Sequence, residues 1–174
     1  ALLSRGLGDV YKRQYEWLGR KENFPLHLIS NQPEYRLHGQ LDNAEYSLKN
    51  KIKDREPVLI NVEDAKERNI ENNDIVLIFN KRGRVLAGAR LSNQIMRGVL
   101  VLSTGAWFDP DYKINTDLHG NPNVLTRDIG ASQLSQAPTS HTCLVEIRKA
   151  RQNEIKQVKI FLKPKIQKKL VQKY

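Results

Sequence analysis

A loop of hydrogen-bonding side chains between residues 31 and 40 is the stretch of the sequence best suited to hold a ligand. It contains little of the serine and glycine that fill flexible linkers. The guanidinium of Arg36 offers a two-pronged donor to a phosphate or a ring carbonyl. His38 and Gln40 stand two residues apart and project to the same side if the segment is extended. These groups suit an anionic, planar ligand rich in heteroatoms, although in isolation the loop is better interpreted as a polar surface loop.

Two further stretches add candidate binding groups. Asn123 lies in a turn rich in glycine, proline and asparagine, and its amide can donate and accept hydrogen bonds at once against a ring edge. Trp107 and Phe108 form an aromatic pair in a loop bounded by glycine and proline. Such a pair either fills a core or forms the wall of a ligand pocket, and both interpretations stay open.

Motifs of self-sufficient catalysis are absent from the sequence. It contains no GxxxxGK[ST], GxGxxG, HExxH, GxSxG or CxxC pattern. The single cysteine, Cys143, excludes an internal disulfide and is expected to be a small buried residue of a strand rather than a reactive thiol. His119 has no Cys, Asp or Glu at metal-ligand spacing, so no zinc site is expected. The sequence therefore indicates binding rather than chemistry of its own.

These candidate groups need a scaffold, and the strongest structural pattern in the chain starts at Pro57. Residues 58–60 predict a strand. Asn61 then stands at the N-cap of a short helix over residues 64–68, where Asp64 can complete a capping box. This helix is too short to be the crossover of a βαβ unit, so a compact piece of β-barrel is expected.

The second half of this pattern predicts a β-hairpin. Residues 75–79 are apolar on both faces, which is typical of a buried strand. Residues 80–83 form the turn, with Gly83 at the position that tolerates positive φ. Residues 84–89 return as the partner strand.

Shorter elements are expected on either side. Residues 24–30 alternate as a first strand does, with Leu26 and Leu28 on one face. Residues 98–103 predict another buried strand, and residues 141–147 a closing strand. The other expectations are a short helix over 44–48, one or two helical turns over 129–134, an irregular and mobile segment over 111–119, and a strand over 158–162.

The formal net charge of +10 on 174 residues invites a nucleic-acid hypothesis. Residues 151–174 contribute +7 and residues 1–23 contribute +2, which leaves +1 for residues 24–150. The basicity is an end effect, and a charged tail is more often a solvated extension than a specific contact with nucleic acid. No nucleic-acid partner is therefore expected, and no apolar run approaches the length of a membrane span.

The first fourteen residues match nothing that follows. DVYKRQ, over residues 9–14, resembles the in-frame translation of a transposon adapter, which favours a non-native leader joined to an incomplete gene over a natural basic linker. The expected organisation is a non-native leader over 1–14, a linker from missing upstream domains over 15–23, a barrel over 24–149 and a basic tail over 150–174.

The central stretch also carries a family resemblance. Its pattern INxxDAxxRxIxxxDxVxxFNxRGxxLAGA resembles the C-terminal dinucleotide-binding domain of the molybdopterin oxidoreductases, most of all the trimethylamine N-oxide, dimethyl sulfoxide and biotin sulfoxide reductases. Residues 24–41, 103–110 and 120–136 agree with these proteins in order and spacing. Four collinear motifs make a specific signal, and the resemblance covers residues 24–149.

The resemblance implies a fold, a cofactor and a set of contacts. The fold is mainly β with short helices, a six-stranded double-psi β-barrel of the aspartate decarboxylase-like kind. The cofactor is bis(molybdopterin guanine dinucleotide), whose molybdenum takes its protein ligand from outside this chain, and Trp107 would help to shape the substrate funnel. Relatives tend to carry a histidine where Gln32 stands, so no contact is assigned there. The implied cofactor contacts are Ser30, Asn31, Arg36, His38, Gln40, Asn123, Asp128, Ser132 and Gln136.

The implied reaction is reduction of an S-oxide or N-oxide by oxygen-atom transfer at molybdenum, with no catalytic residue in this chain and no turnover by the fragment alone. Its partners would be the upstream domains of the same polypeptide, a small-molecule oxide, and an electron donor of the cytochrome or thioredoxin-like kind. A periplasmic location is favoured over a cytoplasmic one. The alternatives are a stand-alone β-barrel binding module without molybdenum and a basic nucleic-acid-binding protein.

Overall fold

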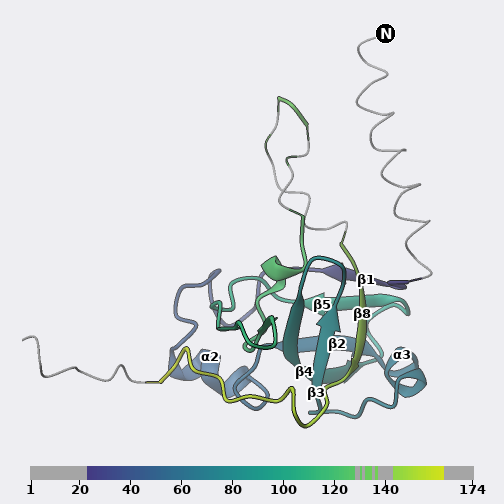
Figure 1. The fold of residues 1–174 in the computed structure, drawn as a ribbon, viewed down its shortest axis with the longest axis horizontal. Coiled ribbons are helices and arrows are strands. Elements are labelled where there is room, and N and C mark those ends of the chain that lie inside the picture. Colours follow the sequence, from purple (N-terminus) through teal and green to yellow (C-terminus); the bar gives the residue numbers. More distant parts are fainter. Residues whose placement is uncertain (1–22, 128–129, 131, 135, 137–142, 163–174) are drawn as a thin grey trace, which may run out of the picture.

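The computed structural model of the chain describes residues 23–127, 130, 132–134, 136 and 143–162 (Figure 1). Its strands follow in the order β2–β5–β1–β8–β3–β4, and a further pairing of β2 with β4 closes them into a six-stranded barrel. The β1–β5 and β2–β4 pairs are parallel, and the other four are antiparallel. The barrel strands are β1 (Leu26–Ile29), β2 (Pro57–Asn61), β3 (Ile75–Phe79), β4 (Arg84–Ser92), β5 (Val99–Leu102) and β8 (Cys143–Lys149).

Shorter elements surround this barrel. Two-residue strands β6 (Pro110–Asp111) and β7 (Thr116–Asp117) extend the sheet beyond β4. The helices are α2 (Glu45–Asn50), α3 (Val62–Glu67) and the 3₁₀ turn η1 (Pro122–Val124). The expected mainly β barrel with short helices is confirmed. Within the described residues, no helix has the length and apolar character that crossing a membrane requires.

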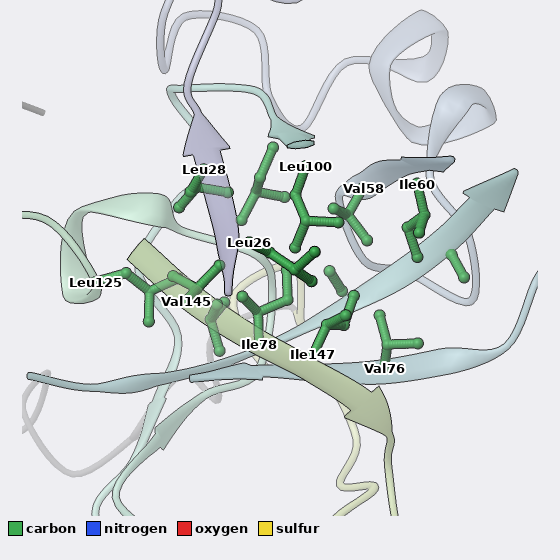
Figure 2. Close-up of a cluster of buried hydrophobic side chains, with 14 of the residues drawn as sticks. Leu26, Leu28, Val58, Ile60, Val76, Ile78, Leu100, Leu125, Val145 and Ile147 are labelled. Carbon is green, nitrogen blue, oxygen red and sulfur yellow. The ribbon is translucent and has the colours of Figure 1, made fainter. Parts of the chain in front are cut away.

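Alternate side chains from all six barrel strands point inward and form one core (Figure 2). Burial of each large aliphatic side chain contributes roughly 1.5–3 kcal/mol, so this closed core is the main source of stability. Cys143 belongs to it, as predicted, and burial raises the pKa of its thiol. The labelled members in Figure 2 are Leu26, Leu28, Val58, Ile60, Val76, Ile78, Leu100, Leu125, Val145 and Ile147.

The strand β3 is apolar on both faces because each face has its own cover. Val76 and Ile78 point into the barrel. Leu77, on the opposite face, joins a second buried cluster with Leu118, against which Ile155 packs. The predicted burial of this strand is confirmed, and its outer cover comes from two segments whose burial the sequence did not indicate.

The predicted N-cap is confirmed, but the predicted capping box is wrong. The side chain of Asn61 accepts a hydrogen bond from the backbone N–H of Glu63 at 2.9 Å, and α3 starts at Val62. Asp64 does not reach back to Asn61. Its carboxylate instead accepts the backbone N–H of Gly98 at 2.6 Å, which fixes the turn that leads into β5.

The role expected for Gly83 is also wrong. The residue connects β3 to β4 as predicted, but its φ is not among the positive values in the chain. A Cβ at this position would overlap the carbonyl oxygen of Val124. Glycine is needed here because the hairpin turn and η1 approach each other backbone to backbone.

Three expectations outside the barrel are corrected by the structure. Residues 111–119 contain β7 and the end of β6, which pair with each other. The carboxylate of Asp117 accepts the N–H groups of Asp109, Gly120 and Asn121 at 2.8 Å each and so fixes the turns around β7. Residues 158–162 form no strand, because the N–H groups of residues 159 and 160 donate to the Asp109 carboxylate. Residues 132–134 are bends rather than helix, and residues 129 and 131 lie outside the described residues.

Candidate functional site

Two loops on one side of the barrel are clasped together, and we call them the polar loop (residues 31–40) and the Trp loop (residues 103–108). The backbone N–H of Thr104 donates to the carbonyl of Asn31 at 2.8 Å, and the Ser103 hydroxyl donates to the Asn31 side chain at 3.0 Å. The indole N–H of Trp107 donates to the carbonyl of Gly39 at 2.6 Å. The two loops most strongly indicated by the sequence therefore form one surface.

The polar loop is a series of turns and not an extended segment. His38 has a φ of +50°, and the N–H of Gln40 donates to the carbonyl of Leu37 at 2.9 Å. The expectation that His38 and Gln40 project together from an extended chain is therefore wrong. The amide of Gln32 lies 2.7 Å from His38 Nδ1 and accepts the His38 backbone N–H at 3.2 Å, so it fixes the histidine. Both His38 and Gln40 remain exposed.

Arg36 points into the molecule, away from that exposed surface. Its guanidinium donates to the carbonyls of Thr104 at 3.0 Å and His38 at 3.1 Å. One of its nitrogens lies 3.0 Å from the carboxylate of Glu56, and another lies 3.4 Å from that of Asp42. Its side chain has no exposed surface. This position makes Arg36 an internal link between the polar loop and the Trp loop rather than a group open to a phosphate.

Arg36 is part of a buried group of titratable side chains that the sequence did not indicate. We call Arg36, Asp42, Lys51, Glu56 and His119 the ionic cluster. The Lys51 ammonium donates to Asp42 at 2.7 Å and to Glu56 at 3.0 Å, and these side chains are at most 1% exposed. Two cations face two anions, so the cluster is balanced when the histidine is neutral. A buried charge needs such a partner because desolvation otherwise disfavours it strongly.

The pKa shifts in the cluster agree with that assignment. Burial, followed by the positive charge of Lys51, lowers the pKa of His119. We assign the neutral form with its proton on Nδ1, which donates to the carbonyl of Trp107 at 2.9 Å. Burial opposes ionisation of Asp42, but hydrogen bonds from Lys51 and the Trp107 N–H outweigh it and lower the pKa of the carboxyl. Beside the cluster, the Tyr35 hydroxyl donates to Glu56 at 2.5 Å.

We expect the stability of the folded chain to fall in two stages as the pH is lowered, because of these lowered pKa values. A group whose pKa is lower in the folded state binds its proton more readily when unfolded, so its contribution is complete above the unfolded pKa and is lost on acidification. The decline should begin below pH about 6.5 through His119 and continue below pH about 4 through Asp42. For one proton the slope is at most about 1.4 kcal/mol per pH unit. Urea denaturation between pH about 8 and pH about 2 measures both stages.

A pair of histidine variants assigns the first stage. His119→Asn keeps a donor near the Trp107 carbonyl and removes the titration, so the slope between pH 7 and pH 5 should flatten. His38→Asn, which removes an exposed histidine of the polar loop, serves as the control. An unchanged slope in His119→Asn would rule out the neutral buried histidine.

The other predicted contacts are Ser30 and Asn123, which lie in or beside elements of the barrel domain, and Asp128, Ser132 and Gln136, which follow η1 in the sequence. Ser30 directly follows β1 and is half-buried, while Asn123 is exposed in η1. Gly120, which lies shortly before η1, packs closely on Glu56 of the cluster. A Cβ added at Gly120 would lie 2.5 Å from Cβ of Glu56. Ser132 and Gln136 are exposed, and the Gln136 amide donates to the Ser132 carbonyl at 3.2 Å. Asp128 lies outside the described residues.

The structure thus defines a β-barrel domain, and the candidate binding residues lie in the loops at its rim. Within the described residues, no group of three or more His, Cys, Asp or Glu side chains is arranged to hold a metal ion. The sequence profile of the Molydopterin dinucleotide binding domain family matches residues 26–144. The chain belongs to this family.

Individual relatives agree with that assignment. The chain is 47% identical over 132 residues to biotin sulfoxide reductase of Cereibacter sphaeroides, which covers 76% of the chain and 18% of that protein. It is 50% identical over 133 residues to trimethylamine-N-oxide reductase of Salmonella typhimurium, with 74% and 16% covered. The chain therefore spans less than a fifth of the length of these relatives.

A solved structure supports the fold independently. Acetylene hydratase from Pelobacter acetylenicus superimposes with a TM-score of 0.60 at 13% identity, covering 75% of this chain and 19% of that one. This likeness concerns the fold alone. Together with the closed six-stranded barrel, the family assignment confirms the expected double-psi β-barrel and the expected class of cofactor, a molybdopterin dinucleotide.

Proposed function

We propose that this chain forms the C-terminal cofactor-binding domain of a molybdenum oxidoreductase that reduces S-oxides or N-oxides, and that it holds one side of bis(molybdopterin guanine dinucleotide). The observation that carries the proposal is the clasp of the polar loop on the Trp loop, in a chain that matches the dinucleotide-binding family over residues 26–144. Relatives that are 47–50% identical are named as reductases of biotin sulfoxide and trimethylamine N-oxide.

The residues at the rim fit the chemistry of such a cofactor. A pterin and a guanine both present ring edges with alternating donors and acceptors, which amide and imidazole groups can match. His38, Gln40 and Asn123 carry such groups on exposed positions. The clasp gives the polar loop a fixed shape before any ligand binds, which lowers the entropic cost of binding. Arg36 is left out of the contact set, because its guanidinium is engaged inside the molecule.

When bound, the cofactor supplies oxygen-atom transfer at molybdenum, and the protein supplies orientation and a dry surface. Within the Trp loop, we assign the shaping of a substrate funnel to Trp107. Its indole N–H is bonded to the Gly39 carbonyl and its backbone N–H to Asp42, so the ring is held in one orientation. The ring is half-buried, which leaves one part of it free to form a pocket wall.

The rest of that pocket would come from other domains of a longer polypeptide. Large apolar side chains lie exposed in and beside the two loops, including Leu37 at 59%, Leu41 at 67% and Phe108 at 49%. Apolar side chains gathered at a functional surface are typical of an interface. The chain spans less than a fifth of its reductase relatives, so such domains would account for the difference in length.

The test uses the complete reading frame that contains this segment, expressed in a host supplied with molybdate. The purified protein is assayed for molybdenum, for GMP released by acid hydrolysis, and for reduction of trimethylamine N-oxide, dimethyl sulfoxide and biotin sulfoxide by reduced viologen. Metal, GMP and turnover together would support the proposal, and the preferred oxide would identify the substrate. A protein without molybdenum or GMP would overturn it in favour of a stand-alone barrel module.

A pair of variants tests whether Asn123 contributes to the binding of GMP. Asn123→Ala should lower the GMP retained by the purified protein, because it removes an exposed amide that can pair with a ring edge. Asn93→Ala removes another exposed asparagine, from the turn after β4, and is the matched control. Equal GMP content in the two variants would exclude Asn123 from the contact set.

A further inference from the structure

The segment over residues 151–162, which we call the strap, packs back on the barrel although the sequence assigned it no role. At its start, the carboxylate of Glu154 accepts from Arg148 at 2.6 Å and from Arg84 at 2.7 Å. The hydrogen bond from Arg148 is the main reason that the pKa of Glu154 falls to about 2. These contacts anchor the strap to β8 and β4.

The middle of the strap is fixed by one carboxylate and one guanidinium. Asp109, which follows the Trp loop, accepts the backbone N–H groups of Lys159 and Ile160. Arg55, which precedes β2, donates to the carbonyl of Lys156. Val158 lies between these anchors and is 6% exposed. The strap therefore reaches its last described residues in a defined position.

That position brings Phe161 onto the ionic cluster. Its ring lies 4.8 Å from the His119 ring, centroid to centroid, and meets it edge to face. The Lys51 ammonium lies 5.8 Å from the centre of the Phe161 ring, and the Trp107 ring lies 6.0 Å away. One phenyl ring thus contacts a cation of the cluster, its histidine and the aromatic residue of the Trp loop.

We propose that Phe161 is a positioning residue, which seals the ionic cluster and thereby holds Trp107 and the polar loop in the arrangement that receives the cofactor. The effect on the loops follows from this chain's contacts alone, and only the effect on the cofactor rests on the proposed function. Phe161 need not touch the cofactor to act in this way.

The physical argument starts from the dryness of the cluster. Ion pairs weaken as the surrounding dielectric rises, and an apolar ring over Lys51 and His119 keeps that dielectric low. Trp107 depends on the same cluster at two atoms, because Asp42 accepts its N–H at 2.9 Å and His119 donates to its carbonyl. Trp107 in turn donates to Gly39 of the polar loop. Water admitted at Phe161 would therefore loosen a continuous series of contacts that ends at the rim.

The test compares Phe161→Ala with Leu162→Ala, which shortens the neighbouring side chain at a position 54% exposed. Both are made in a Trp17→Phe background, so that Trp107 is the only tryptophan in the chain. Phe161→Ala should shift the Trp107 emission to longer wavelength and speed hydrogen exchange of its indole N–H about tenfold. Phe161→Leu, which keeps an apolar cover, should restore most of the protection.

Exchange at Ile78 in the barrel core separates this effect from general destabilisation. The proposal requires that Ile78 stays protected while Trp107 is exposed to exchange. Equal behaviour of Phe161→Ala and Leu162→Ala at Trp107, or equal loss of protection at Ile78 and Trp107, would overturn it.

The second measurement is the GMP retained by the complete reading frame. Phe161→Ala should lower it by about tenfold, since each side chain that must be ordered again on binding adds a cost of about that size. If Phe161→Ala displaces Trp107 but retains as much GMP as the unmutated protein, the link to the cofactor is overturned. If the unmutated protein holds no GMP, the proposed function fails, and the tryptophan measurements still decide whether Phe161 positions the Trp loop.

Discussion

Replacing Glu56 by alanine is expected to destabilise the folded chain by about 3–5 kcal/mol, because it leaves a buried excess of positive charge. Arg36 and Lys51 would then share Asp42 as their only anion in the cluster. The Tyr35 hydroxyl would lose the acceptor that it contacts at 2.5 Å. Urea denaturation at pH 7 measures the change. Glu45→Ala, which breaks an exposed pair with Lys49, is the control and should cost less than about 1 kcal/mol.

A double variant separates the charge from the packing. Arg36→Met combined with Glu56→Leu removes one cation and one anion and leaves Lys51 paired with Asp42. Replacing a complete buried ion pair by apolar side chains is often neutral, whereas removing one partner is strongly destabilising. The double variant should therefore be more stable than either single variant by about 1–3 kcal/mol. Strictly additive losses would show that the cluster acts through packing alone.

The direction of Arg36 shows where prediction from the sequence stops. An arginine in a polar loop has the same local pattern whether it faces a ligand or the interior. Its anionic partners, Asp42 and Glu56, lie on either side of the short helix that was predicted over residues 44–48, and Lys51 follows that helix. Closure of the barrel brings these side chains together with His119, which lies about 60–80 residues further along the chain. One available signal was Glu56 itself, a charge directly before a strand buried at Pro57 and Val58.

The barrel strands were predictable because each one has a local cause. Residues two apart in a strand share a face, so a closed core leaves an apolar side chain at every second position of each strand that lines it. The strap leaves no such pattern, because its last turn depends on the side chain of Asp109 rather than on a partner strand. The turns on either side of β7 likewise depend on a side chain, the carboxylate of Asp117. Contacts between one side chain and a distant backbone have no periodicity, and the sequence pattern therefore missed them.

The clasp between the two loops is expected to be most sensitive at Gly105. This glycine has a φ of +88°, and a Cβ there would overlap the backbone carbonyl of His38. Gly98 has a φ of +78°, yet nothing lies within 4 Å of the corresponding Cβ position. Gly98→Ala should therefore show the cost of the backbone conformation alone, about 1–2 kcal/mol. Gly105→Ala should add about 1–3 kcal/mol for the overlap.

Hydrogen exchange at Thr104 distinguishes a loosened clasp from a general loss of stability. Gly105→Ala should expose the Thr104 N–H, which donates to Asn31 across the clasp, to hydrogen exchange, while Gly98→Ala should leave it protected. In the complete reading frame, Gly105→Ala should also release GMP, since it moves the backbone at His38. Equal stability of the two variants, with Thr104 protected in both, would show that the polar loop accommodates the added methyl group without further loss of stability. The clasp would then have no part in shaping the site, and the binding surface would have to be sought elsewhere on the barrel.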